Sequence, residues 1–308
     1  MNSIPSPFVN RGVITSPEDF FGRKIEINEI LTRLRTMQST AVVGERRIGK
    51  SSLLYHLYQT GVRRLDNDAC FRFLYLDLQD AHYHTARGFL HTVLATIGAS
   101  VDGVKPEHPL NRNLVAFSEA IEAWERAGQC IVLLLDELES VFKHQHEFTD
   151  DFFDHLRSQL SLRKLACVST SQRPLQDLCL EGKLTSPFYN VFTVTELKEL
   201  TEDESMELIA AYHERLSFTE AELTFIFSYL DPHPLKLQIL CDWVIRNRER
   251  RLSERDLIAG IGKDYAGFFP GRWKKLLKAK RVLSVDNIKK VLETAKKARD
   301  AFGPSGKD

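Results

Sequence analysis

Residues 44–51, GERRIGKS, form a loop of the kind that holds phosphate groups. Gly44 and Gly49 let backbone N–H groups turn towards phosphate oxygens, and a helix following the loop adds the positive end of its dipole. Lys50 is expected to reach the β- and γ-phosphates of a nucleotide, and Ser51 to ligate Mg²⁺. An apolar stretch precedes the loop and a helical pattern follows it, which is the context that such a loop requires.

The whole loop is predicted to contribute to nucleotide binding. The predicted binding residues in it are Gly44, Glu45, Arg46, Arg47, Ile48, Gly49, Lys50, Ser51 and Ser52. Arg46 and Arg47 occupy variable positions of the loop, and their side chains are expected to point away from the phosphates. We therefore expect these two arginines to contact another segment of the chain or another subunit.

A pair of carboxylates follows the apolar run CIVLLL and predicts the second half of the site. Asp136 is expected to join Ser51 as a ligand of Mg²⁺, and Glu137 to orient and deprotonate an attacking water molecule. The alternative is two solvated carboxylates at a strand end, and the phosphate-binding loop upstream makes it the weaker interpretation. For Glu139 we favour a surface position over a role near the metal.

A third polar cluster, CVSTSQR, ends another apolar run. Ligands bind at the carboxyl edge of parallel sheets, so Ser169, Thr170 or Ser171 is expected to face the γ-phosphate and the attacking water. Thr170 is the predicted catalytic residue, with its two neighbours as alternatives. Arg173 is a further catalytic candidate, which would sense phosphate charge or act on a neighbouring subunit. The alternative, which we rate equally, is that Arg173 is an ordinary surface residue before Pro174.

Strand and helix patterns alternate through the first two thirds of the chain. Short apolar runs predict strands at 39–44, 71–78, 130–136, 165–170 and 191–197. Helical patterns lie between them, at 24–37, 50–60, 85–98, 112–127 and 147–160. The middle three strands carry successive apolar residues, which is typical of strands covered on both faces. The alternation predicts a three-layer α/β/α core with a five-stranded parallel sheet.

After residue 197 only helices are expected, which predicts a small all-helical second domain. The helical segments are 201–214, 217–229, 233–248 and 253–260. Thr201 with Glu204, and Thr219 with Glu222, have the spacing of capping boxes. The predicted division is an extended segment at 1–19, the core at 20–197, the helical domain at 198–262, and a basic helical segment with a disordered end at 263–308.

Charge is balanced over the whole chain, with 42 basic and 42 acidic residues, but not along it. Residues 271–308 hold 12 Lys or Arg and 4 Asp or Glu, a net charge of +8. A solvated helix with a frayed end explains this excess, and we favour that explanation slightly. The alternative is a surface for DNA or for an acidic protein partner.

Other classes of protein and site find little support. The five cysteines form no CxxC pair, which favours reduced thiols in a cytoplasmic protein. The longest apolar run, CIVLLL, is far shorter than the roughly 20 residues of a membrane helix, so no membrane association is expected. His82, His84 and His91 lack further ligands at suitable spacing and are interpreted as surface residues rather than a metal site.

These motifs resemble the STAND and AAA+ branch of P-loop NTPases, in which GERRIGKS is the Walker A motif and the carboxylate pair the Walker B motif. The chain is most similar to bacterial AAA-like ATPases that begin with an Asn-Pro-Phe-like segment and FFGR. Here that segment reads SPFVNRGVITSPEDFFGR, and HPLKL lies in the region of the helical lid. The resemblance covers approximately residues 6–245.

The resemblance implies an ATPase that uses Mg²⁺ and slow hydrolysis as a conformational switch. It implies that Gly22 and Arg23 help to form the nucleotide pocket, that Pro234 packs near the adenine, and that Lys236 occupies a sensor-2-like position. ATP is also favoured because the sequence has no guanine-reading Asn/Thr-Lys-x-Asp motif. The alternative function is a nucleotide-gated module that binds DNA or protein with little or no turnover.

Relatives of this kind commonly form rings in which an arginine completes the site of the adjacent subunit. The resemblance therefore implies a homo-oligomer with an arginine acting in trans. The candidates for that arginine are Arg157, Arg163 and Arg173.

Overall fold

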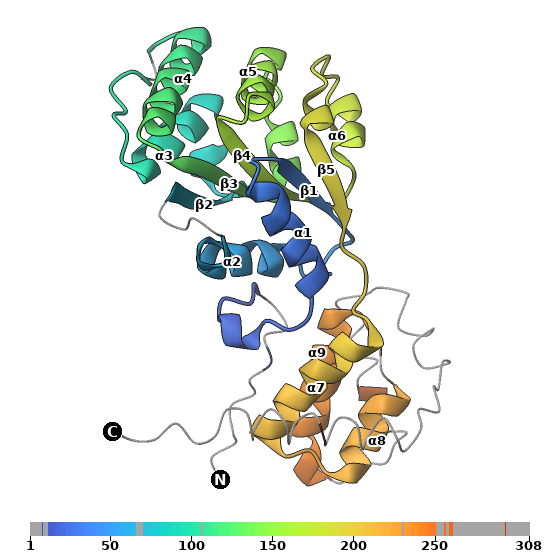
Figure 1. Cartoon of the computed structure of the whole chain (residues 1–308). Coiled ribbons are helices and arrows are strands. Elements are labelled where there is room, and N and C mark those ends of the chain that lie inside the picture. Colours follow the sequence, from blue (N-terminus) through green and yellow to red (C-terminus); the bar gives the residue numbers. More distant parts are fainter. Residues whose placement is uncertain are drawn as a thin grey trace. The chain divides into compact units, whose positions relative to one another are not determined.

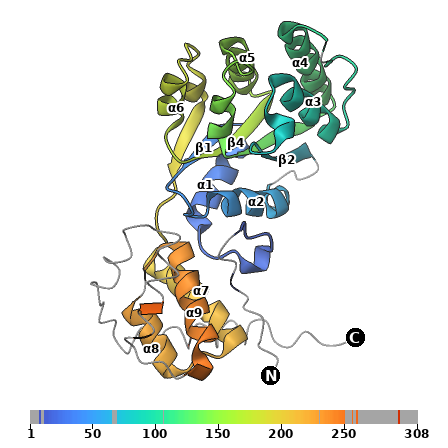
Figure 2. The same cartoon turned by 180° about the vertical axis from the view of Figure 1, so that it is seen from behind.

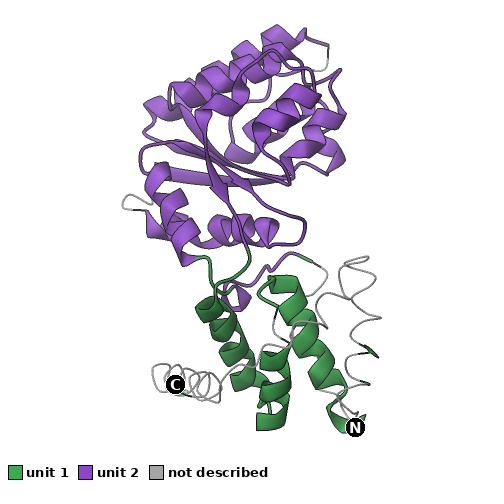
Figure 3. Ribbon diagram, turned by 90° about the vertical axis from the view of Figure 1, so that its right-hand side faces the viewer, with its two compact units in different colours: residues 1–12, 21–23, 199–308 green, residues 13–20, 24–198 purple. Residues whose placement is uncertain are grey.

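The computed structural model describes residues 8, 12–65, 70–105, 107–229, 231–250, 256, 259–260 and 293. These residues fall into two compact units (Figure 3). The core unit contains residues 13–20 and 24–198. The helical unit contains Phe8, Gly12, residues 21–23 and the described residues from Glu199 onward.

The core unit is built on one five-stranded sheet (Figure 1). Its strands are β1 (Ser39–Val43), β2 (Phe71–Asp77), β3 (Cys130–Asp136), β4 (Leu165–Ser171) and β5 (Phe192–Glu196). They lie in the order β2-β3-β4-β1-β5, and every neighbouring pair is parallel. The predicted five-stranded parallel sheet is confirmed. In it, β4 lies between β1, which leads into the phosphate-binding loop, and β3, which ends in the carboxylate pair.

Helices cover both faces of this sheet, as Figures 1 and 2 show. One face packs against α1 (Lys24–Leu34) and α2 (Lys50–Thr60). The other packs against α3 (Ala86–Ile97), α4 (Leu110–Arg126), α5 (Asp150–Ser161) and α6 (Leu175–Glu181). The predicted three-layer α/β/α architecture is therefore confirmed.

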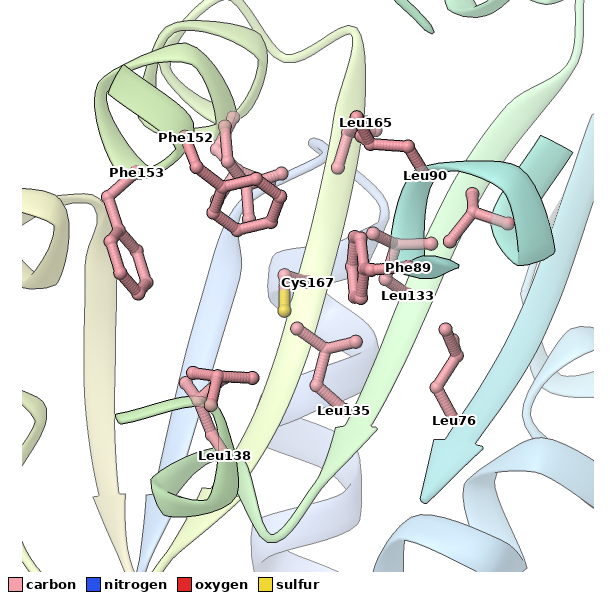
Figure 4. Packing of buried hydrophobic residues seen from close by; sticks show 14 of the residues in the cluster. Leu76, Phe89, Leu90, Leu133, Leu135, Leu138, Phe152, Phe153, Leu165 and Cys167 are labelled. Atoms are coloured by element: carbon pink, nitrogen blue, oxygen red, sulfur yellow. The ribbon is translucent and has the colours of Figure 1, made fainter. Parts of the chain in front are cut away.

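Successive residues of the central strands point to opposite faces, and both faces are apolar. On β3, Leu133 and Leu135 pack under the larger helical layer, together with Cys167 of β4 and Phe89 of α3 (Figure 4). Each fully buried leucine contributes about 1.5–3 kcal/mol to folding. The sheet is thus a rigid support, and side chains at its strand ends are held in fixed places.

The helical unit consists, among the described residues, of α7 (Glu202–Leu216), α8 (Glu220–Ser228), α9 (Pro234–Arg246) and a short 3-10 turn at Arg248–Arg250. Both predicted capping boxes are present, at the start of α7 and at the start of α8. The apolar sides of the three helices form one core, into which Phe8 also packs, with its ring 4.1 Å from that of Tyr212.

The structure differs from the sequence prediction mainly in short elements. The seven-residue helix α6 and the 3-10 segment Leu138–Lys143 were not predicted, because each is too short to display a helical period. Helix α1 ends at Leu34 rather than at 37, and Met37 has a left-handed backbone. Of the predicted helix 253–260, only three residues are described, and the basic segment 271–308 lies outside the described residues apart from Glu293.

No helix among the described residues is both long and apolar enough to cross a membrane.

Candidate functional site

The site is assembled at the carboxyl edge of the sheet, on the face covered by α1 and α2. On β3 this face carries Val132 and Leu134, which are buried under the two helices, and then Asp136. The corresponding row of β4 ends in Thr170. Alternate residues of a strand point to the same face, so Asp136 and Thr170 lie on the face that carries the buried apolar residues of their strands. Both are the last residues of their rows, next to the start of α2.

The phosphate-binding loop connects β1 to α2, and its first glycine is enclosed. The Gly44 N–H donates to the carbonyl of Ser171, and Leu197 N–H donates to the carbonyl of Val43. A Cβ atom on Gly44 would lie 2.7 Å from the Leu197 carbonyl oxygen, closer than real Cβ contacts come. Gly49 has a φ of 102°, a conformation that side chains disfavour. The loop therefore needs a glycine at each end.

Between the glycines the loop is exposed on one side. Glu45, Arg46 and Arg47 are exposed, whereas Ile48 is buried and anchors the loop to the apolar core under α2. Arg47 has a φ of 68°, in the left-handed region that is unfavourable for residues with a Cβ atom. The loop thus keeps a strained backbone at this position.

Lys50, the first residue of α2, is buried inside the loop. Its Nζ donates hydrogen bonds to the carbonyl oxygens of Gly44, at 2.9 Å, and Glu45, at 3.0 Å. Burial lowers the pKa of this ammonium, and the neighbouring carboxylates, Glu137 foremost, oppose that effect. Cationic Lys50 and the N-terminus of α2 together make this end of the loop attractive to anions.

A chain of hydrogen bonds that begins at Ser51, the residue after Lys50, links α2, β3 and β4. Ser51 Oγ donates to Asp136 Oδ1 at 3.1 Å, and Thr170 Oγ1 donates to the same oxygen at 2.6 Å. Thr170 Oγ1 in turn accepts from the backbone N–H of Glu137 at 2.9 Å. The structure therefore brings together four of the residues that the sequence selected.

Of the three hydroxyl residues left open by the sequence, Thr170 is the one that meets Asp136. Ser169 and Ser171 belong to the opposite row of β4, because they are one residue away on either side. The hydroxyl of Ser171 donates to the carbonyl of Arg173 at 2.7 Å. The register of β4 thus decides which hydroxyl joins the site.

Ser51 and Asp136 form a donor set that fits Mg²⁺. Both offer hard oxygen ligands, and Mg²⁺ in nucleotide sites takes only one or two protein ligands, with phosphates and water completing its shell. Among the described residues, no group of three or more His, Cys, Asp or Glu side chains is arranged to hold a metal ion. A metal at this edge would therefore depend on a bound phosphate chain as much as on protein ligands.

Glu137 lies one residue beyond the strand, with a left-handed backbone at φ 54°. Burial raises the pKa of its carboxyl, the Glu139 carboxylate adds to that rise and Lys50 opposes it, so that the pKa is raised to about 7. A carboxyl group with this pKa can accept a proton near neutral pH and is suited to general base catalysis.

Two side chains that sequence reasoning did not place in the site also belong to it. The hydroxyl of Tyr75, on β2, donates to Asp136 Oδ2 at 2.7 Å, and burial together with that carboxylate raises the pKa of Tyr75. The sequence favoured a surface position for Glu139, but it is partly buried and accepts from the Gln172 N–H at 3.2 Å. Neither contact has a local sequence signal, because each joins segments far apart in the chain.

The remaining predicted residues have other surroundings. Arg173 is exposed and pairs with Glu181 of α6. The Ser52 hydroxyl accepts from the Ile14 N–H at 3.0 Å. Of the arginine candidates for action in trans, Arg163 is also exposed and Arg157 is partly buried.

The predicted lid residues belong to the helical unit, together with Gly22 and Arg23. The Arg23 N–H donates to Glu204 Oε1 at 2.5 Å, so this segment is tied to the capping box of α7. Pro234 is the first residue of α9, and Lys236 forms an ion pair with Asp231 at 3.0 Å.

Comparison with known proteins identifies the family. A model of the family described as novel STAND NTPase 2 matches residues 35–248. A search of curated proteins finds no match. The matched range includes the loop, the carboxylate pair, β4 and helices α7 to α9.

Solved structures show the same fold. The Walker-type ATPase of Pyrococcus abyssi has a TM-score of 0.61 at 16% identity, covering 93% of this chain and 92% of that one. The ORC1 protein of Aeropyrum pernix, solved in complex with DNA, has a TM-score of 0.53 at 13% identity, covering 94% and 80%. Domain III of the replication initiation protein DnaA of Thermotoga maritima has a TM-score of 0.52 at 15% identity, covering 82% and 96%.

These neighbours share an α/β nucleotide-binding fold with this chain, and their low identities limit the likeness to that fold. The family model spans more than half of the chain and includes the whole phosphate-binding edge of the sheet. On this basis the chain belongs to the novel STAND NTPase 2 family of P-loop NTPases.

Proposed function

We propose that this chain binds ATP and hydrolyses it slowly with Mg²⁺, and that its nucleotide state acts as a conformational switch. The observation that carries the proposal is the hydrogen-bonded chain from Ser51 through Asp136 and Thr170 to the backbone of Glu137. It joins the hydroxyl and carboxylate that suit Mg²⁺ to the backbone of Glu137, the residue whose side chain suits a general base. Membership of the family supports NTPase activity in general.

The loop is proposed to bind the triphosphate. Phosphate oxygens are stronger acceptors than neutral carbonyls, so Lys50 would exchange its bonds to Gly44 and Glu45 for bonds to the β- and γ-phosphates. Ser51 and Asp136 would hold Mg²⁺, which when bound neutralises phosphate charge. Arg46 and Arg47 are exposed, so the proposal assigns phosphate binding to the backbone of the loop rather than to these two side chains.

Glu137 is proposed as the general base. Its ionised carboxylate takes a proton from a water molecule as the water oxygen bonds to the γ-phosphorus, and the bond from that phosphorus to the leaving ADP oxygen breaks. Thr170 holds the backbone of Glu137 in place. Its hydroxyl accepts a hydrogen bond from the Glu137 N–H and donates one to Asp136. If Thr170 also contacts the γ-phosphate, as proposed, loss of that phosphate would act on both Glu137 and Asp136.

The pH dependence of hydrolysis tests this role. Only the ionised form of Glu137 accepts a proton, so we expect kcat/KM for MgATP to fall as the pH drops through about 7. Well below that pH the decrease should approach about tenfold per pH unit. Phosphate release measured across this range at fixed free Mg²⁺ provides the profile. A wild-type profile that stays flat across neutral pH would contradict Glu137 as the base.

A second candidate function, a nucleotide-gated DNA-binding module, rests on the net charge of +8 in residues 271–308. If these residues bind DNA phosphates, the affinity of the full chain for duplex DNA should fall steeply with salt, and truncation at residue 270 should remove that slope. Binding to labelled duplex over a salt series, with and without ATP, measures both effects. If truncation leaves the affinity for duplex DNA unchanged, the DNA-binding function is contradicted.

A further inference from the structure

Tyr75 reaches the site from the neighbouring strand. The parallel register of β2 and β3 pairs Asp77 with Asp136 and Tyr75 with Leu134. Tyr75 therefore lies on the same face as Asp136, two positions before it along the sheet. The length of the phenol ring spans this offset and brings its hydroxyl to 2.7 Å from Asp136 Oδ2.

The ring of Tyr75 is held by two tyrosines of α2. Its centroid lies 5.3 Å from that of Tyr55 and 6.0 Å from that of Tyr58, and the two helical rings lie 5.8 Å apart. The three rings form what we call the tyrosine cluster, and α2 is the helix that begins with Lys50 and Ser51. The cluster therefore connects the phosphate-binding helix to the metal-binding carboxylate.

The bonds to Asp136 divide between its two oxygens. Oδ1 accepts from the hydroxyls of Ser51 and Thr170, whereas Oδ2 accepts from Tyr75. The terminal torsion of an aspartate has broad minima, so bonds to one oxygen alone leave the plane of the carboxylate poorly fixed. A donor on the second oxygen removes that freedom.

We propose that Tyr75 is a positioning residue for Mg²⁺ binding, which orients the Asp136 carboxylate towards the metal through its bond to Oδ2. The proposal rests on the proposed function, because it concerns the same metal site. It assigns the hydroxyl of Tyr75 a role beyond packing. The partners of metal ligands typically change metal affinity by about 10- to 100-fold when they are removed.

The substitution Tyr75→Phe tests the proposal, because it keeps the ring in the tyrosine cluster and removes only the hydroxyl. Calorimetry with a non-hydrolysable ATP analogue, at a series of Mg²⁺ concentrations, gives the Mg²⁺ midpoint for tight binding. We expect this midpoint to rise about tenfold in the variant. Analogue affinity in EDTA should stay at the wild-type value, because the ring and the loop are unchanged.

Tyr55→Phe is the matched control. It removes a hydroxyl from the same cluster without touching Asp136, so its Mg²⁺ midpoint should equal that of the wild type. A Tyr75→Phe midpoint within twofold of wild type would overturn the inference, and so would an equal loss of affinity in EDTA, which indicates a purely structural effect. If the wild type itself binds the analogue without any dependence on Mg²⁺, the proposed metal site fails instead.

Discussion

The variant Glu137→Gln is expected to lose ATP hydrolysis by at least about 100-fold while still binding MgATP. General base catalysis typically contributes 10²- to 10⁴-fold, and the amide of glutamine cannot accept the proton. Binding should persist because Lys50, Ser51 and Asp136 are unchanged, and Gln keeps the size of the side chain. Single-turnover phosphate release and equilibrium binding of a labelled nucleotide measure the two effects separately.

Glu125→Gln is a suitable control for that experiment, because Glu125 is an exposed carboxylate of α4 in the same unit. It should hydrolyse ATP at the wild-type rate. If Glu137→Gln also turned over at the wild-type rate, another group would have to be the base. A loss of binding equal to the loss of turnover would instead assign Glu137 to nucleotide binding.

The second large effect is expected for Lys50→Met, which should weaken MgATP binding by about 10- to 100-fold. This range corresponds to the loss of a hydrogen bond from a charged donor, about 1.5–3 kcal/mol. Hydrolysis should fall further, because the ammonium also stabilises charge that develops in the transition state. Isothermal calorimetry and steady-state phosphate release give the two values.

Folding should survive this substitution. Methionine has nearly the length of lysine and carries no charge. Burial disfavours the charged form of Lys50, as its lowered pKa shows, so the neutral side chain removes that cost. Lys143→Met, at an exposed position after the carboxylate pair, is the matched control and should bind MgATP as the wild type does. Wild-type affinity in a folded Lys50→Met protein would contradict the role of Lys50 in phosphate binding.

Residues that lie together in the sequence could be predicted well. The loop and the carboxylate pair each sit in one short segment, and their flanking apolar runs identify buried strands. The five-stranded parallel sheet follows from the same runs, because strands covered on both faces need helices between them. The capping box at Thr201 and Glu204 was also predictable, since both of its hydrogen bonds are local.

Contacts between strands could not be predicted in the same way. A shift of one residue in the position of β4 would move each of its side chains to the opposite face of the sheet. The sequence could therefore not choose Thr170 over Ser169 or Ser171. The bond from Tyr75 to Asp136 depends on the register between β2 and β3, which no local pattern specifies. Glu139 was misplaced for a similar reason, because its partner is the backbone of Gln172 after another strand.

The most direct test of the central claim is phosphate release from ATP by the purified chain, with Mg²⁺ and with EDTA, beside Glu137→Gln under the same conditions. The proposed site predicts slow release that requires Mg²⁺ and disappears in the variant. Release that continues in EDTA, or that is equal in the wild type and Glu137→Gln, would contradict a magnesium-dependent ATPase built on Ser51, Asp136 and Glu137.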